Sequence, residues 1–274
     1  MIPVRTVGEV FDAIQQAKTG APAYCTNFFP VQAKLQGWID HGELWGEIGE
    51  AATLFFRKDS DFWHLYFCAA SVAALRQEVA ASPNLKAERM VIDLVGNELA
   101  LGDLLALMES AKFRRYTHLS RMARAGHTDP QDWQIDGSPV VRADKPDCAA
   151  VLDLLDRVFD RYGEQLPMRY EIEAAVEGRQ ILAVKRDKAL AALLFFETHG
   201  LTSTLRFWAV SEQFRSCRFG SALMRHYFAT QKAVRRFILW VTTDNESAIQ
   251  KYRHFGYAPD GLVDHVLVNE LIRP

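Results

Sequence analysis

Apolar runs and helical periods in the second half of the chain predict two successive strand–helix pairs. A short, aromatic-rich apolar run at 205–210 predicts a buried strand, and apolar residues recur with a helical period after the turn that follows it. A second run at 237–242 precedes a helix that we expect to begin at Asp244 or Asn245 and to end near Gly256. A strand, a helix and a second strand in this order indicate a parallel pair of strands.

Similar patterns divide the rest of the chain. We expect strands at 43–48, 51–59, 62–69, 89–95, 113–125, 139–143, 180–185, 189–197 and 201–210. We expect helices at 7–18, after Pro30, and at 72–80, 101–110, 146–160 and 168–177. The short turns at 187–188 and 199–200 indicate antiparallel neighbours. Parallel and antiparallel pairs together predict an α/β protein (α+β, with a mixed sheet).

A polar stretch that contains glycine and proline, Ala125 to Ser138, predicts a linker. The chain is long for one domain and comfortable for two. We therefore expect two domains, residues 1–130 and 131–274.

The first half repeats the order of elements of the second half from about residue 43. Residues 104–113 (LLALMESAKF) align with residues 248–257 (AIQKYRHFGY), which places Met108 opposite Tyr252. This order predicts a tandem duplication; an unrelated α+β domain that stabilises its neighbour is the alternative. The first half has no counterpart of the basic turn Arg215–Gly220 and no phenol at Met108, so we expect it not to bind the ligand of the second half.

A basic turn follows the apolar run at 205–210. The first N–H groups of the helix after this turn have no partner inside the helix, and the helix dipole favours an anion there. Arg215 and Arg218 add positive charge to the turn, which suits a diphosphate.

The residues from Val210 onward resemble the pyrophosphate motif of the GNAT superfamily of acyl-CoA-dependent N-acyltransferases. The family has Val, four residues, Arg or Gln, two residues, Gly, one residue, and Gly or Ala. Here Arg215 takes the place of the Arg or Gln, and Gly220 that of the last Gly. Arg218 departs from the pattern, because a glycine there lets the backbone approach the pyrophosphate without a side chain.

A second GNAT signature lies on the predicted last helix. The family has Asn, Ala and Tyr on this helix, which ends in Phe-Gly-Phe or Phe-Gly-Tyr. Asn245, Ala248 and Tyr252 match it, followed by Phe255-Gly256-Tyr257. The resemblance covers about residues 138–268 and implies a GNAT fold for the second domain and a degenerate GNAT-like fold for the first.

The resemblance also implies a donor and roles for several residues. The donor would be acetyl-CoA or another acyl-CoA. Its pyrophosphate would lie against Arg215, Ser216, Arg218, Gly220 and Ser221. The backbone of Trp208 and Val210 would line the thioester and the pantetheine arm, and Asn245 would contact that arm. Tyr252 would be the general acid that protonates the departing thiolate.

The general base is less determined. Thr202, Thr204, Arg206 and Trp208 alternate onto one face of the predicted strand and offer no carboxylate. Glu197 is the candidate that we retain as catalytic, and Asp264, His265 and a chain of water molecules are the alternatives.

Composition excludes several classes of function. The 274 residues carry a net charge of −2, which gives no argument for nucleic acid as a partner. No apolar stretch reaches the roughly 18 residues that a membrane helix needs, so we expect no membrane contact. Four cysteines without disulfide or metal spacing favour a cytoplasmic protein without a metal.

The sequence therefore predicts an N-acetyltransferase that moves an acetyl group from acetyl-CoA to a primary amine by direct attack. The acceptor would be a small-molecule amine or a protein amino group, and the protein could form a homodimer. The first alternative is a non-catalytic protein of GNAT fold that binds or senses acyl-CoA. The second is an acyl or aminoacyl transferase of the tandem type with a larger donor.

Overall fold

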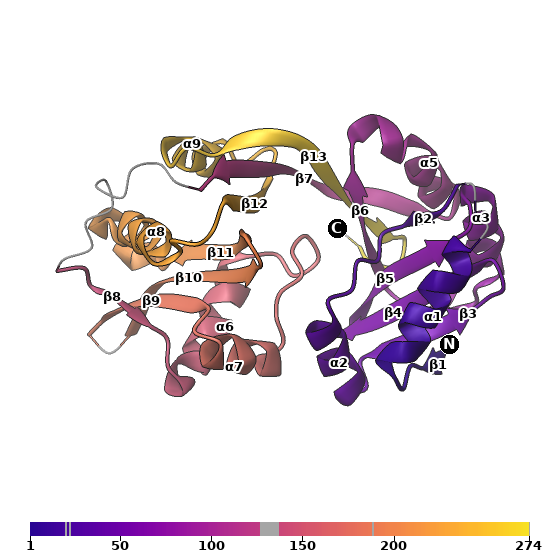
Figure 1. Cartoon of the computed structure of the whole chain (residues 1–274), viewed down its shortest axis with the longest axis horizontal. Coiled ribbons are helices and arrows are strands. Elements are labelled where there is room, and N and C mark those ends of the chain that lie inside the picture. Colours follow the sequence, from indigo (N-terminus) through magenta and orange to yellow (C-terminus); the bar gives the residue numbers. More distant parts are fainter. Residues whose placement is uncertain (20, 22, 127–136, 188, 274) are drawn as a thin grey trace. The chain divides into compact units, whose positions relative to one another are not determined.

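The computed structural model describes residues 1–19, 21, 23–126, 137–187 and 189–273. It consists of two compact units, which are described separately (Figure 1). Unit 1 comprises Met1–His118 and Leu262–Pro274, and unit 2 comprises Leu119–Gly261. Most of the predicted linker lies outside the described residues.

Unit 1 begins with two helices and continues as a sheet with helices on both faces. Its elements are β1 (Ile2–Pro3), α1 (Val7–Lys18), β2 (Cys25–Thr26), α2 (Gln32–Asp40), β3 (Leu44–Ile48), β4 (Ala52–Asp59), β5 (Phe62–Ala69), α3 (Val72–Ala81), α4 (Asn84–Ala87), β6 (Met90–Gly96), the 3₁₀ turn η1 (Glu98–Leu101), α5 (Gly102–Ser110) and the first part of β7 (Phe113–Ala125). The strand order is β1-β3-β4-β5-β6, followed by the last part of β13 (Ala258–Asn269).

Unit 2 has the same order of main helices and strands, without counterparts of β2 and α4 among its described residues. Its elements are β8 (Val140–Arg142), the 3₁₀ turn η3 (Lys145–Asp147), α6 (Cys148–Val158), α7 (Arg169–Glu177), β9 (Ile181–Arg186), β10 (Ala189–His199), β11 (Thr202–Val210), the 3₁₀ turn η4 (Glu212–Cys217), α8 (Phe219–Thr230), β12 (Arg236–Thr242) and α9 (Glu246–His254). The strand order is β8-β9-β10-β11-β12, followed by the last part of β7. β11 and β12 are parallel and the other pairs are antiparallel, which confirms the predicted mixed sheet.

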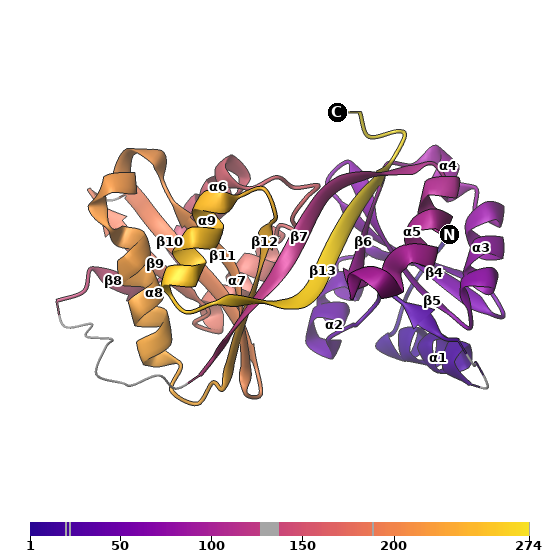
Figure 2. The ribbon, with the colours of Figure 1, turned by 90° about the horizontal axis from the view of Figure 1, so that it is seen from above.

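Two apolar cores hold the helices of unit 2 on its sheet. On one face α8 and α9 cover a cluster that includes Leu205, Tyr227 and Leu239. On the other face α6 and α7 cover a cluster that includes Phe195 and Phe207. Figure 2 shows the sheet of unit 2 between these two pairs of helices.

Each unit takes its last strand from the other half of the chain. β7 follows α5 of unit 1, but Leu119–Ala125 pair with β12 of unit 2. β13 follows α9 of unit 2, but Val263–Val268 pair with β6 of unit 1. The units therefore differ from the expected division into 1–130 and 131–274, because strand pairing and not chain order defines them.

In unit 2 the parallel strands β11 and β12 are paired over their first residues and then separate. They pair from Thr202 opposite Arg236 to Leu205 opposite Leu239, and both strands continue without pairing beyond that point. On the other edge of β11 a β-bulge occurs at the same level. Phe196 pairs with Leu205 but Phe195 pairs with Phe207, so Arg206 is the extra residue.

The bulge changes the face of the sheet on which the side chains after Arg206 lie, compared with the prediction from the sequence. A regular strand would place Trp208 on the same face as Thr204. With one residue inserted, Trp208 joins Leu205 on the α8/α9 face, and Phe207 turns to the α6/α7 face. The alternation expected for Thr202, Thr204, Arg206 and Trp208 therefore stops at Arg206.

Unit 1 contains the same parting, but its own chain fills it. β5 and β6 pair only at Trp63–Met90 and His64–Val91. Beyond these pairs β2 lies antiparallel to the end of β5, and the Asn27 side chain joins the two parted strands. Its Nδ2 donates to the carbonyls of Leu65 and Asp93, both at 3.0 Å, and its Oδ1 accepts the Phe67 N–H at 2.7 Å.

We predict that Asn27→Ala destabilises the protein, because three backbone groups lose their partners between the parted strands. A lost hydrogen bond in a partly buried place costs about 1 kcal/mol, so the free energy of unfolding should fall by about 2–4 kcal/mol. Urea unfolding followed by tryptophan fluorescence measures this change. Asn97→Ala is the matched control, since Asn97 is exposed and its side-chain Oδ1 accepts the Leu99 N–H. Equal effects of both changes would contradict this account.

Candidate active site

The turn between β11 and α8 presents unused backbone donors at the point where β11 has parted from β12. η4 occupies Glu212–Cys217, and Arg218 precedes the first residue of α8. The first bond inside α8 runs from the Ala222 N–H to the Arg218 carbonyl at 3.1 Å. The N–H groups of Phe219, Gly220 and Ser221 come before it, so no bond within the helix uses them. No side chain caps this helix start.

Arg218 has the backbone conformation that favours glycine. Its φ is +58° and its ψ is +15°, in the left-handed region. A side chain other than glycine costs roughly 1–2 kcal/mol there. The GNAT motif has glycine at this place, and the structure shows the physical reason, which is the shape of the turn. Arg215 and Arg218 leave the turn positively charged; Arg215 lies 3.9 Å from Glu212 across an exposed ion pair.

Gly220 allows the start of α8 to approach Trp208 closely. A Cβ at this position would lie 3.0 Å from Cζ2 of the Trp208 ring and 3.3 Å from its Nε1. The Nε1–H of Trp208 is buried and has no hydrogen-bond partner among the described residues. A buried donor without a partner costs free energy, so a ligand carbonyl in this place would gain by accepting from it.

Helix α9 contributes the second half of the site. The Asn245 side chain caps α9, because its Oδ1 accepts the Ala248 N–H at 3.1 Å. This bond leaves the Nδ2 donors of Asn245 outside the cap. The Tyr252 ring lies 5.5 Å from the Trp208 ring, centroid to centroid. Burial, and then the charge of Glu164, raise the pKa of Tyr252, so its phenol stays protonated at neutral pH.

Glu197, the carboxylate expected to act as a base, is engaged by the bulge residue. Arg206 Nη1 lies 3.3 Å from both carboxylate oxygens of Glu197, and Arg206 Nη2 donates to the Gln165 carbonyl at 3.3 Å. Both charged side chains are about one quarter exposed. The guanidinium of Arg206 therefore holds the Glu197 carboxylate in an ion pair.

Glu164 is a candidate site residue that the sequence reasoning missed. It lies in the turn after α6, where its N–H donates to the Asp160 carbonyl at 2.9 Å. Burial raises the pKa of Glu164 to about 7; Arg206 lowers it and Asp160 raises it. Its charge also acts on Tyr252, so the carboxyl and the phenol belong to one electrostatic environment. No motif marks Glu164, because a loop fold and not a residue spacing brings it there.

Asp264 and His265 do not belong to the unit that carries this site. Both lie on the part of β13 that pairs with β6, where Asp264 is opposite Val95 and His265 opposite Leu94. The exchange of last strands removes them from unit 2, and chain order alone gives no sign of this.

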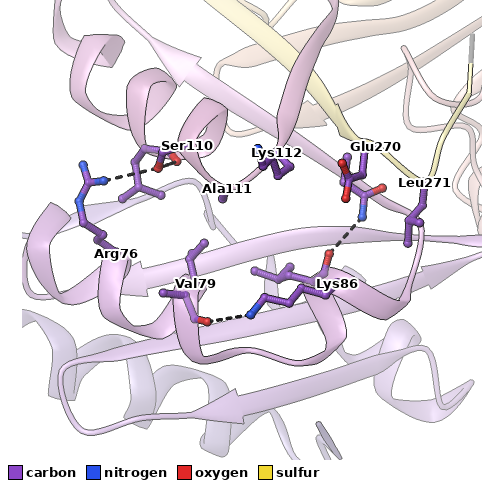
Figure 3. A pocket seen from close by; sticks show the side chains of 12 residues that line it. Arg76, Val79, Lys86, Ser110, Ala111, Lys112, Glu270 and Leu271 are labelled. Carbon is purple, nitrogen blue, oxygen red and sulfur yellow. Dashed lines mark hydrogen bonds between the residues drawn. The ribbon is translucent and has the colours of Figure 1, made fainter.

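The corresponding places in unit 1 are closed by its own side chains. Ser71 caps α3, the counterpart of α8, and its Oγ accepts the Ala74 N–H at 3.2 Å. Met108 of α5, at the place of Tyr252, is fully buried in the core. A cavity of about 330 Å³ lies elsewhere, between the C-terminal parts of α3 and α5, and includes Arg76, Lys86 and Lys112 (Figure 3).

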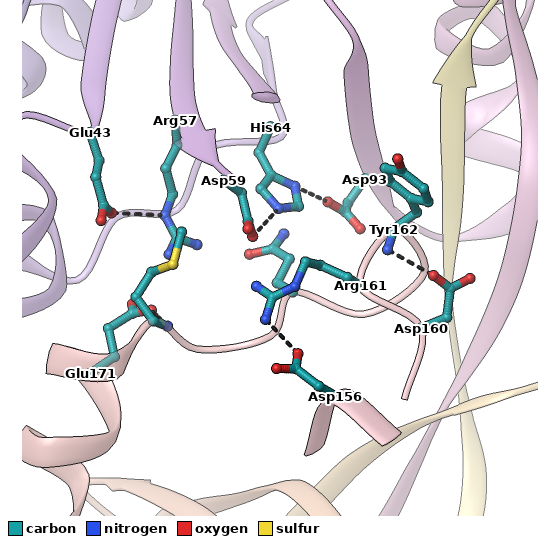
Figure 4. Close-up of polar contacts among 12 residues, drawn as sticks. Glu43, Arg57, Asp59, His64, Asp93, Asp156, Asp160, Arg161, Tyr162 and Glu171 are labelled. Atoms are coloured by element: carbon teal, nitrogen blue, oxygen red, sulfur yellow. Dashed lines mark hydrogen bonds and ion pairs between the residues drawn. The ribbon is translucent and has the colours of Figure 1, made fainter. Parts of the chain in front are cut away.

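Each unit also contains contacts between its own basic and acidic side chains. In unit 1 His64 lies between two carboxylates, with Nε2 3.4 Å from Asp59 Oδ2 and Nδ1 3.9 Å from Asp93 Oδ2 (Figure 4). In unit 2 Arg161 Nη2 donates to Asp156 Oδ1 at 2.6 Å, on the loop that leads to Glu164.

Unit 2 therefore combines a parted parallel pair of strands, a helix start with unused N–H groups and a buried phenol in one α/β domain. A family model described as "Acetyltransferase (GNAT) family" matches residues 148–257. This part of the chain is a GNAT domain.

Solved structures resemble the whole chain. A tandem GNAT protein from the clavulanic acid biosynthesis pathway is 13% identical with a TM-score of 0.63, over 100% of this chain and 98% of that chain. A GCN5-related N-acetyltransferase from Sphaerobacter thermophilus is 13% identical with a TM-score of 0.58, over 98% and 92%. A GNAT-family acetyltransferase from Colwellia psychrerythraea is 10% identical with a TM-score of 0.55, over 97% of each chain.

At these identities the likeness shows the fold, and it confirms the predicted tandem GNAT architecture. No curated protein matches the chain. Within the described residues there is no helix with the length and apolar character needed to cross a membrane.

We predict that Arg218→Gly stabilises the free protein by up to about 1 kcal/mol, because glycine adopts the left-handed conformation without steric cost. Thermal unfolding measured by circular dichroism tests this. Arg215→Gly is the control, since η4 around Arg215 has no left-handed residue. It removes the same charge and should destabilise the protein or leave it unchanged. A lower melting temperature for Arg218→Gly than for Arg215→Gly would refute the strain argument.

Proposed function

We propose that the protein is an acyl-CoA-dependent N-acyltransferase, with acetyl-CoA as donor and a primary amine as acceptor. The observation that carries the proposal is the parting of β11 and β12 next to the uncapped start of α8. The backbone edge of β11 after Leu205 has no partner on the β12 side in the described part of unit 2. An extended ligand with amide groups can pair with such an edge, as the segment at β2 and Asn27 pairs with β5 in unit 1.

Three sets of protein groups would bind acetyl-CoA. The N–H groups of Phe219, Gly220 and Ser221 would hold the pyrophosphate, with Arg215, Ser216 and Arg218 around it. The backbone of Trp208 and Val210 would line the pantetheine and the thioester, and Asn245 Nδ2 would donate to a pantetheine carbonyl. The buried Trp208 Nε1–H would gain an acceptor.

The acyl transfer would proceed by direct attack. The neutral amine nitrogen attacks the thioester carbonyl carbon, backbone donors stabilise the oxyanion, and the carbon–sulfur bond breaks. Tyr252 gives its proton to the departing thiolate, and the base takes the proton that the amine loses. A carboxyl group with a pKa of about 7 is partly ionised at neutral pH, and it would therefore be able to take this proton from a bound amine.

We propose Glu164 as that base, with Glu197 as the alternative. Glu164 combines a raised pKa with an electrostatic influence on Tyr252. Glu197 is held by Arg206, and we infer that its role is to position the bulge residue.

We predict that Tyr252→Phe lowers kcat for acetyl-CoA and an amine by about 10²–10⁴-fold, the usual effect of losing a general acid. The affinity for acetyl-CoA, measured by calorimetry, should change little, because the ring that packs on Trp208 remains. Tyr227→Phe is the matched control, since Tyr227 is buried in the same core and donates to Ser203 instead. Full turnover by Tyr252→Phe would exclude the acid role. Binding of acetyl-CoA without any turnover across an amine panel would favour the sensing protein.

We predict that kcat/KM rises with pH through about 7 and then levels off, because a base acts only after it has lost its proton. In Glu164→Gln the rate should fall by about 10²-fold or more and lose this dependence. Glu197→Gln should keep the pH dependence, since the carboxyl that titrates near 7 remains. Loss of the pH dependence in Glu197→Gln alone would transfer the role of base to Glu197.

A further inference from the structure

Three side chains that metals prefer converge in unit 1, outside the candidate active site. They are Glu98 of η1, His118 of β7 and His265 of β13, and their ligand atoms all lie within 4.8 Å of one another. His265 Nε2 is 3.2 and 3.1 Å from the two Glu98 carboxylate oxygens, and His118 Nε2 is 3.8 Å from Glu98 Oε2. The three residues are far apart in the sequence, which explains why their spacing gives no metal signal.

We propose that these residues form a binding site for a divalent transition metal with two imidazoles and one carboxylate as ligands, of the kind that binds Zn²⁺. Imidazole nitrogens with a carboxylate oxygen suit Zn²⁺, and three protein ligands leave a fourth position for water. The proposal does not depend on the proposed acyltransferase, because none of the three residues belongs to unit 2.

The burial of the three ligands is graded from inside to outside. His265 is 2% exposed and fixed in the ladder between β13 and β6, so it forms the inner wall of the site. The side chains of His118 and Glu98 are 38% and 54% exposed, which leaves a path for an ion and for the water ligand. A buried inner ligand and exposed outer ligands allow metal exchange with solvent.

Metal binding would require one of the two imidazole rings to rotate. They are stacked with their centroids 4.4 Å apart and an angle of 3° between their planes. Lone pairs of parallel rings run side by side, whereas a tetrahedral ion needs them to converge. His118 is the ring with room to turn, because it is partly exposed and His265 is not.

A bound ion would join three separate segments of unit 1. η1 follows β6, and β7 and β13 are the two strands whose pairing is exchanged between the halves of the chain. Because the unfolded chain does not bring these ligands together, binding would stabilise the folded protein by mass action.

The test uses the full chain, freed of metal by a chelator and then titrated with Zn²⁺. We expect one ion per chain by calorimetry and a higher melting temperature with Zn²⁺. Substitution of Co²⁺ should give the intense visible absorption of a four-coordinate ion. His118→Ala and Glu98→Gln should weaken binding by about tenfold or more, because each removes a ligand.

His199→Ala is the matched control, since His199 is an exposed histidine of β10 in unit 2 and should leave the affinity unchanged. His265→Gln is a further variant, and far-ultraviolet circular dichroism shows whether it folds. Equal Zn²⁺ affinity in His118→Ala, Glu98→Gln and the unchanged protein would overturn the proposal. So would the absence of binding at micromolar Zn²⁺, which would leave the cluster as a histidine–carboxylate hydrogen bond.

Discussion

The separation of two parallel strands is the constraint on which the candidate site depends. β11 and β12 hold together over four residue pairs and then diverge, and the extra residue Arg206 bends β11 at that level. The divergence leaves backbone groups of β11 without a partner in the sheet, and it brings the strand end to the uncapped start of α8. Trp208 reaches Gly220 and Tyr252 only because the bulge turns it to the α8/α9 face. The inserted residue thus lies at the level where the backbone edge of β11 opens, and it sets the face from which Trp208 contacts the phenol.

Each unit contains a pair of parallel strands that separate, and the two units differ in what pairs with the exposed backbone groups. In unit 1 the chain supplies its own partner, with β2 along the end of β5 and an amide side chain between the strands. Its helix start is capped by Ser71, and a methionine stands where unit 2 has a tyrosine. Unit 2 has none of these closures in its described residues, and it retains a buried donor on Trp208. Because buried backbone groups are nearly always paired, the open parting of unit 2 favours a ligand there.

The sequence predicted what depends on local pattern and missed what depends on tertiary geometry. Nearly all helices and strands follow from periodicity and apolar runs, and the turn from Arg215 to Gly220 lies where the motif predicts. Arg218, the departure from the motif, adopts the conformation that the missing glycine would. The bulge at Arg206 could not be predicted, because an inserted residue leaves no mark in an alternating strand. Glu164 was missed for a similar reason: its loop position and burial, which raise its pKa, are tertiary properties.

Because the last strands are exchanged, the first half of the chain has a structural role in unit 2 that does not depend on catalysis. Residues Leu119–Ala125 complete the sheet of unit 2 beside β12, and without them β12 would be an edge with unpaired N–H and C=O groups. The same holds for unit 1, whose β6 is covered by residues from the C-terminal end. Neither half of the chain therefore has a complete sheet by itself. The first half of the chain is therefore structurally necessary for unit 2, because the sheet that carries the candidate site ends on one of its strands.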